Sequence, residues 1–259
     1  MSTATVAVNS PLKPYVKETK YEFLRLLRAR SFSIATIGFP ISFYLLFGIV
    51  ASSGHANGAA VAKYLLATYA VFGLVGSSLF GLCTTISNER AQGWLELKQA
   101  SPMPPAAYLL AKLLTAIAFG LIIFTLLLLC GLTMGHVHFT GTQIFHLVLT
   151  VVGGVFPFAA LGILLSQVVP PSAAIGVVNL IYLPMSFLSG LWFPLDGLPH
   201  WLQTIAPVWP TWHLGQLALH TIGMPTPWSV AANVVWLACF TVVALGLGLM
   251  LFRRSAGKA

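Results

Sequence analysis

Charge is scarce in this sequence. Only 7% of its 259 residues are Asp, Glu, Lys or Arg, whereas 58% are hydrophobic. A soluble domain carries about a quarter charged residues, so a water-soluble globular protein is excluded. Acidic residues are rarest, five against thirteen basic ones. Because the basic residues stand at the ends of long apolar runs, they indicate membrane topology and not a nucleic-acid surface.

Several chemical signatures are missing as well. Cys83, Cys130 and Cys239 lie inside apolar runs without Cys-x-x-Cys spacing, so we expect neither a disulfide framework nor a zinc site. His136 and His138 could bind a metal, but no third ligand is near them in the sequence, and we interpret them as polar loop residues. A phosphate loop, a nucleophile elbow and convergent acids are also absent from the sequence. We therefore predict that this chain is not an enzyme, with no catalytic residue, metal or cofactor of its own.

Six apolar segments are each long enough to cross about 30 Å of hydrocarbon as a helix. They lie near residues 33–51, 61–86, 106–134, 144–166, 172–191 and 228–252. The sequence thus predicts an all-α integral membrane protein, with one six-helix transmembrane domain over residues 31–254 and a short tail at 255–259. Inside these segments we find almost no ionisable group, which argues against ion-coupled transport.

The N-terminal residues 1–30 are polar and basic and do not resemble a cleavable signal peptide. Residues 15–30 combine apolar side chains at helical spacing with a basic face, which favours an amphipathic helix in the membrane interface over a solvated helix. If both termini are cytoplasmic, every Lys and Arg except Lys63 lies on the cytoplasmic side. The positive-inside rule therefore predicts that orientation.

A charged segment, residues 88–102, separates the second and third apolar runs. Only Lys63, Lys112 and Asp196 carry charge elsewhere between residues 31 and 252. Ser87 or Asn88 can cap the first turn of a helix here, and Glu89 suits its N-terminus. We predict a short amphipathic helix over residues 88–101, shaped to fit a groove on a cytoplasmic partner. An ordinary cytoplasmic loop is the alternative.

Tryptophan and proline gather between the fifth and sixth apolar runs. This stretch is too proline-rich for one helix and too apolar for a solvated loop. Since tryptophan prefers the membrane–water interface, we predict two short helices, near residues 199–205 and 211–223, in an outer re-entrant segment over residues 193–223. An apolar extracellular cap is the alternative.

Two motifs resemble those of ABC-2 type (type-2) ABC transporter permeases. The first, Glu89–Arg90–x–x–Gly93–Trp94–Leu95–Glu96 followed by Ser101–Pro102, is similar to the family pattern E-R-x-x-G-T-L-E…S-P. It differs at Trp94, where Thr or Ser is usual. The second runs Ser189–Gly190–Leu191–Trp192–Phe193–Pro194, then Leu198–Pro199–x–Trp201–Leu202 and Pro207–x–x–Pro210. It is similar to the family's SG-x-x-F-P…LP-x-W-L…P passage.

The resemblance implies the permease subunit of an ATP-binding-cassette exporter in a bacterial cell membrane, most similar to small multidrug or lipooligosaccharide exporters. It implies a separate ATPase in two copies that binds ATP and Mg, a second permease copy in a homodimer, membrane lipid, and a drug, lipid-linked or saccharide cargo as partners. Nucleic acid is not among the implied partners. A non-transporting membrane sensor that docks a cytoplasmic regulator is the alternative.

The resemblance also assigns roles to individual residues. The ATPase-coupling residues are Glu89, Arg90, Gly93, Trp94, Leu95, Glu96, Ser101 and Pro102. The outer gate and cargo path comprise Ser189, Gly190, Trp192, Phe193, Pro194, Trp201, Trp209 and Trp212.

Overall fold

The computed structural model of this chain describes residues 12–53, 57–94, 97 and 104–256. Across these residues the chain is helical and contains no strand. Six helices are long and apolar enough to cross a membrane: Arg30–Val50, Gly58–Ala91, Ala106–Thr133, Gly141–Val168, Pro171–Leu188 and Val230–Leu251. This confirms the six predicted membrane-spanning helices. The sequence could predict them because hydropathy over some twenty residues is a local property of the chain.

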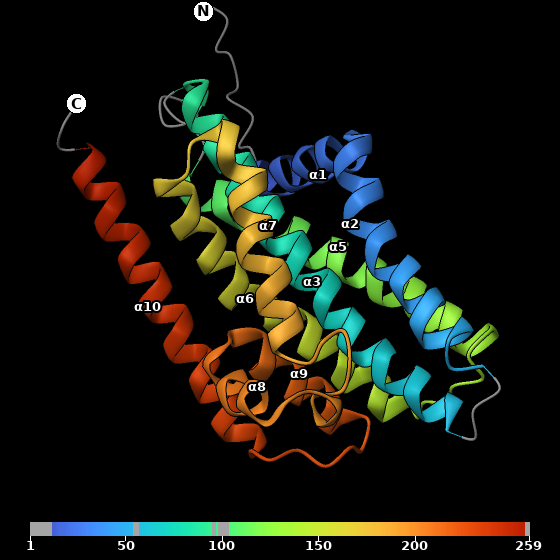
Figure 1. Cartoon of the computed structure of the whole chain (residues 1–259). Helices are drawn as coiled ribbons and strands as arrows, with labels where there is room; N and C mark the ends of the chain where they lie inside the picture. The colour runs from blue at the N-terminus through green and yellow to red at the C-terminus, as the bar shows by residue number, and fades with distance from the viewer. Residues whose placement is uncertain (1–11, 54–56, 95–96, 98–103, 257–259) are drawn as a thin grey trace, which may run out of the picture.

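The elements follow one another as in Figure 1. They are α1 (Lys13–Arg28), α2 (Arg30–Phe43), the π-helical η1 (Tyr44–Val50), α3 (Gly58–Ala91), α5 (Pro105–Thr133), α6 (Gly141–Val168), α7 (Pro171–Leu188), η2 (Leu195–Gly197), α8 (His200–Ile205), η3 (Ala206–Val208), α9 (Pro210–Thr221) and α10 (Val230–Ala256). α1 lies across one end of the long helices, at the same end as the C-terminus of α10, and α8 and α9 lie at the opposite end (Figure 1).

Helix α3 is the centre of the bundle. It packs against α5, α6 and α7, and nearly all of its most apolar stretch is buried. Small residues permit this contact: a Cβ at Gly73 would lie 2.6 Å from Ile123, and one at Gly76 would lie 2.8 Å from Tyr182. Neighbouring helices therefore approach the α3 backbone closely, and the end of α3 is held by several partners at once.

Helix α1 turns sharply into α2 at Ala29, the single residue between them. The hydroxyl of Ser33 donates hydrogen bonds to the carbonyls of Leu26 (2.7 Å) and Leu27 (3.0 Å), which fixes this corner. The inner face of α1 buries Leu26 and also the carboxylate residue Glu22. The amphipathic pattern predicted a helix here, but not that its packed face would carry a charge.

The start of the charged segment differs from the prediction. A new helix capped by Ser87 or Asn88 is wrong, because α3 continues without a break to Ala91. Glu89 and Arg90 therefore lie in the last turn of a long apolar helix and not in the first turn of a short one. Gly93, at φ +72°, then turns the chain with the left-handed geometry that ends many helices.

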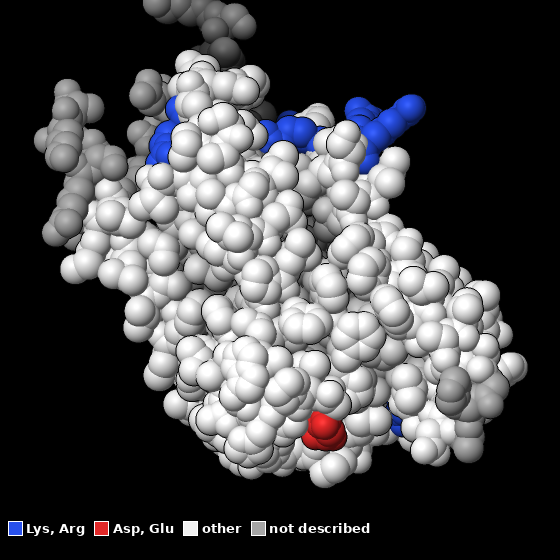
Figure 2. Space-filling view, viewed as in Figure 1, with Lys and Arg blue, Asp and Glu red and all other residues white. Residues whose placement is uncertain are grey.

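The two short helices predicted from the tryptophan- and proline-rich stretch are present as α8 and α9. α8 begins directly after Pro199, and α9 begins with Pro210, whose missing N–H costs nothing because the first helical turn leaves its N–H groups without an intrahelical partner. Figure 2 shows exposed Lys and Arg gathered at the α1 end, while the α8/α9 end is almost free of them. The two ends of the described bundle thus differ in charge.

Candidate functional site

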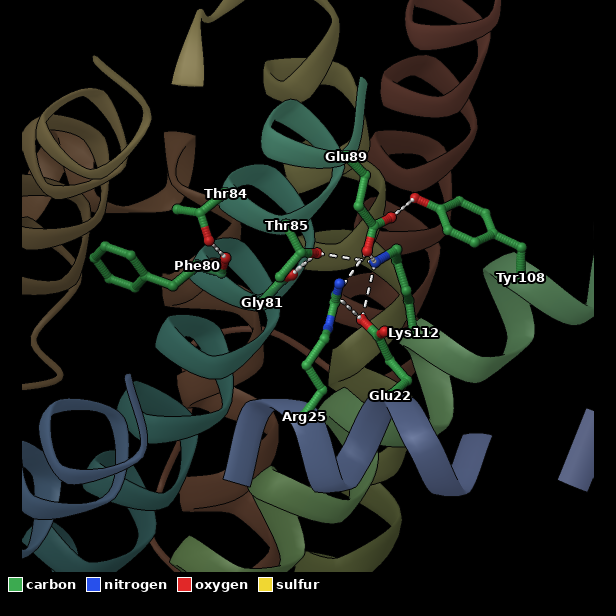
Figure 3. A network of polar contacts seen from close by, with 9 residues as sticks. All are labelled: Glu22, Arg25, Phe80, Gly81, Thr84, Thr85, Glu89, Tyr108 and Lys112. Atoms are coloured by element: carbon green, nitrogen blue, oxygen red, sulfur yellow. Dashed lines mark hydrogen bonds and ion pairs between the residues drawn. The ribbon is translucent and has the colours of Figure 1, made fainter. Parts of the chain in front are cut away.

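Four charged side chains from three helices meet where α1 crosses the ends of α3 and α5 (Figure 3). Lys112 Nζ of α5 lies 2.9 Å from Glu22 Oε1 of α1 and 3.1 Å from Glu89 Oε1 of α3. Arg25 Nη2 lies 2.8 Å and 2.6 Å from the same two oxygens. Two cations therefore neutralise two carboxylates. We call these four residues the charge cluster.

The ammonium group of Lys112 uses all three of its donors. Besides the two carboxylates, it donates to Thr85 Oγ1 at 3.0 Å, and the hydroxyl of Thr85 in turn donates to the carbonyl of Gly81. The Lys112 side chain is only 2% exposed. A buried ion pair is tolerated when its geometry is good and every proton is satisfied. Lys112 meets both conditions, so removing it would leave two buried carboxylates with one cation.

Tyr108 binds the remaining oxygen of Glu89. Its hydroxyl donates to Glu89 Oε2 at 2.5 Å, and Lys112 Nζ lies 4.8 Å from the centroid of its ring. Tyr108 and Lys112 are four residues apart in α5, which places them on one face of the helix. α5 therefore binds the end of α3 through two side chains, the neutral Tyr108 and the charged Lys112.

Arg25 links the charge cluster to water, since its side chain is 45% exposed. Burial alone would lower the pKa of Arg25, but the carboxylates of Glu22 and Glu89 outweigh this effect and raise it. The guanidinium therefore stays protonated and keeps both carboxylates compensated.

The other side of the α3 terminus is tied to the turn between α6 and α7. Ser87 Oγ donates to the carbonyl of Val169 at 3.2 Å, and Arg90 Nη1 donates to the carbonyl of Gln167 at 2.9 Å. Carbonyls at a helix end have no intrahelical partner, so these donors satisfy them. The last turn of α3 is thus bound to α1, α5 and the α6–α7 turn together.

Beyond this anchored turn the described chain presents apolar side chains to solvent. Trp94 is 52% exposed and Leu97 is 68% exposed, directly after the turn at Gly93. Of the predicted coupling residues, Glu89 and Arg90 are thus held inside the bundle, whereas Trp94 faces outward. Leu95, Glu96, Ser101 and Pro102 lie outside the described residues.

The predicted outer path divides into separate groups. Gly190, at φ +75°, closes a turn in which an added Cβ would lie 2.6 Å from Leu195. The hydroxyl of Tyr64 in α3 donates to the carbonyl of Gly190 at 2.9 Å, and Ser189 hydrogen-bonds to Thr211 of α9. Ser189 and Gly190 are buried in these contacts, so their geometry fixes the connection between α7 and helices α8 and α9.

The four tryptophans predicted for the same path differ in exposure and in their contacts. Trp192 packs edge-on against Phe43 and Phe72, with centroids 5.2 Å and 5.8 Å apart. Trp212 is buried against Trp228, near the start of α10. Trp201 is exposed and Trp209 is half-buried. Trp192 and Trp212 therefore belong to separate aromatic contacts.

Phe193 and Pro194 line a cavity of about 450 Å³ at the α8/α9 end of the molecule. Its other walls come from η1, the start of α3 and the residues between them: Phe47, Ala51, Ser52, Asn57, Val61 and Leu65. Of the predicted path residues, only these two line this opening.

The expectation that the spans contain almost no ionisable group is wrong. Glu89 and Lys112 both lie within spans, and sequence reasoning missed their pairing with Glu22 and Arg25. Lys112 is 90 residues from Glu22 and 23 from Glu89 in the chain, so no local pattern connects them. The available signal was that Glu89 and Lys112 have opposite charge and lie at the facing margins of two apolar runs.

Within the described residues, no group of three or more His, Cys, Asp or Glu side chains could hold a metal ion. His136 and His138 have no third ligand there, and Cys83, Cys130 and Cys239 are free thiols.

Comparison with known proteins gives two findings. Residues 18–222 match the family model described as ABC-2 type transporter. The chain is also 26% identical, over 230 residues, to a Bacillus subtilis (strain 168) protein named "Putative transport permease YvfS". That alignment covers 88% of this chain and 94% of the relative. The matched region runs from α1 to the end of α9 and contains the whole charge cluster.

Proposed function

This chain belongs to the ABC-2 type transporter family as a multi-pass membrane permease subunit, and from that premise we propose that its charge cluster couples ATP hydrolysis to movement of the spans. Permeases of this family generally pair with an ABC ATPase. The observation that carries the proposal is that Glu89, from the motif that resembles the family's coupling signature, bridges α1, α3 and α5. A displacement of the charged segment would therefore move α1, α3 and α5 together.

In the proposed arrangement, two ATPase copies dock on the charged segment of a permease homodimer. Trp94 and Leu97 supply exposed apolar surface beside the turn at Gly93, as expected of a segment that seats in a groove of a partner. When ATP binding and hydrolysis move the ATPase, Glu89 carries the displacement to α5 and α1, and Arg90 carries it to the α6–α7 turn. ATP and Mg belong to the ATPase.

The proposed orientation places α1, both termini and the charged segment in the cytoplasm. It is supported by the basic side chains at the α1 end and their scarcity at the α8/α9 end (Figure 2). α1 then lies in the inner interface of a bacterial cell membrane, with its basic face toward anionic head groups. α8 and α9 form the outer re-entrant segment, and the cavity at Phe193 and Pro194 opens outward.

For the cargo we propose an amphiphilic molecule, a drug or a lipid-linked or saccharide compound, exported from the cytoplasmic side. The largely apolar walls of the outer cavity support an amphiphile over an ion. The outer residues Ser189, Gly190 and Trp192 shape the exit by fixing the turn after α7.

The test separates docking from folding. Trp94→Ala combined with Leu97→Ala removes exposed side chains, so we expect normal melting of the permease. In vesicles containing permease and ATPase, these substitutions should lower the stimulation of ATPase activity about tenfold or more, as for the loss of interface anchor residues. Leu46→Ala with Leu129→Ala, which removes exposed apolar groups from spans, is the matched control. Full stimulation in the Trp94/Leu97 variant would overturn the proposal.

A further inference from the structure

A cavity of about 930 Å³ lies between α6, α9 and α10, away from the charge cluster and from the outer cavity at Phe193. α6 and α10 touch near one end, where a Cβ at Gly248 would lie 3.6 Å from the Cα of Leu164. Nearer their N-termini the cavity separates them, with α9 contributing Leu214 and Leu217 to its wall. Its volume is in the range of small-molecule sites.

The wall of this lateral cavity is chemically apolar. Its threonine hydroxyls are already used, because Thr150, Thr221 and Thr241 donate to carbonyls of their own helices at 2.9, 2.7 and 2.7 Å. The remaining lining consists largely of Leu, Val, Phe, Ala and Gly side chains. Water inside would find few partners, so the cavity suits a hydrocarbon chain.

Two imidazole side chains that line the cavity can form hydrogen bonds with a ligand. The side chains of His146 and His220 are exposed, and neither imidazole ring forms a hydrogen bond with another described residue, although their backbone carbonyls accept from Thr150 and Gly223. His146 is five residues into α6, about 8 Å along the axis from the helix start. That depth is close to the level of lipid head groups for a helix that crosses the bilayer.

We propose that the lateral cavity binds one phospholipid of the outer leaflet. Its acyl chain lies between α6 and α10, and its phosphate accepts hydrogen bonds from His146 and His220. α6 and α10 are membrane spans, so the cavity opens onto lipid, and a chain that fills it restores the contacts that an empty cavity loses. The polar rim and apolar interior match a molecule with one polar end. The choice of the outer leaflet rests on the proposed orientation, but the site itself involves neither the ATPase nor the cargo path.

Two residues allow the cavity to be filled without disturbing the core. An added Cβ at Gly153 meets nothing within 4 Å, and Ala238 lines the opposite wall as an exposed residue. Gly153→Phe and Ala238→Phe therefore place a ring in the cavity from α6 and from α10. Gly246→Phe and Cys239→Phe are matched controls, because both positions are exposed on α10 and do not line the cavity.

The experiment uses the full chain in phosphatidylglycerol vesicles that contain a phosphatidylglycerol with a photoreactive group on one acyl chain. We expect adducts on residues 149–157 and 234–242, with a yield that falls about fivefold or more in either filling variant and stays unchanged in the controls. His146→Leu with His220→Leu should lower the same yield, because the head group loses its donors.

Equal adduct yield in parent and filled variants would overturn the proposal, and so would an even spread of adducts over all lipid-facing helices. A second copy of the chain is the competing occupant. Disulfide formation between copies carrying Ala238→Cys, in a background without native cysteine, would show that a protein surface covers the cavity and would also overturn it. ATPase stimulation of the complex is not the readout, so failure here leaves the coupling proposal intact.

Discussion

At the residue scale, Lys112 holds the charge cluster together. Its ammonium contacts both carboxylates of the charge cluster, and its side chain is almost fully buried. Removing one partner of a buried ion pair costs about 3–5 kcal/mol, because the other charge stays uncompensated. We expect Lys112→Met to lower the apparent melting temperature of the purified permease clearly.

The control for this variant is Lys63→Met, which removes a half-buried lysine at the other end of α3. Combining Glu22→Gln with Lys112→Met restores charge balance and should recover much of the loss. A double variant as unstable as Lys112→Met alone would show that electrostatic compensation is not the reason for the effect.

Gly93 is the second residue with a definite expectation. Its φ of +72° disfavours any side chain, while the space around it is open, so Gly93→Ala meets backbone strain of about 1 kcal/mol without a clash. Because this turn sets the direction of Trp94, we expect the Gly93→Ala permease to stimulate the ATPase less, with little change in its own melting temperature. Gly38→Ala, also in open space but without a positive φ, should leave stimulation unchanged. Equal stimulation in both variants would contradict a directing role for the turn.

At the element scale, α9 is held by its buried histidine. The ring of His213 stacks on Trp236 with centroids 4.1 Å apart, and its nitrogens lie 2.8 Å from Asn233 Oδ1 and 2.9 Å from the carbonyl oxygen of Pro207. One side chain thereby joins α9 to α10 and to η3. α9 is therefore a packed part of the bundle.

This contact gives a prediction for α9. His213→Ala deletes a stacked ring and its hydrogen bonds, so we expect a loss of about 2–4 kcal/mol of stability, read as a lower melting temperature in detergent. His220→Ala lies on the same helix but at an exposed position, and it should melt as the parent does. If both variants melted alike, α9 would not depend on this contact.

At the scale of the whole molecule, the two ends differ in charge, and this asymmetry predicts accessibility from each side of the membrane. In permease expressed without the ATPase, a single cysteine at Gln92 should react with a membrane-impermeant maleimide only after the membrane is opened, and one at Thr140 should react in intact cells. Both positions are exposed, so reactivity reports the side and not burial. Labelling of the Gln92 position in intact cells would invert the proposed topology.

Sequence alone determined the class and the number of spans. Twenty apolar residues in a row must be a membrane helix, whatever they pack against, because the bilayer leaves no other way to satisfy the backbone. The positions of α8 and α9 followed from proline and tryptophan in the same way, as local preferences. The motif around Glu89 likewise marked the segment that we propose for coupling.

The tertiary structure decided what Glu89 does. Capping preferences predicted a new helix at Asn88, because a carboxylate that follows an apolar run is typical of the first turn of a helix exposed to water. Folding instead brings Lys112 and Arg25 to that carboxylate from other helices, so the charge is compensated and α3 continues to Ala91. Compensation between residues far apart in the chain is a property of the assembled helices, and no periodicity in the sequence encodes it.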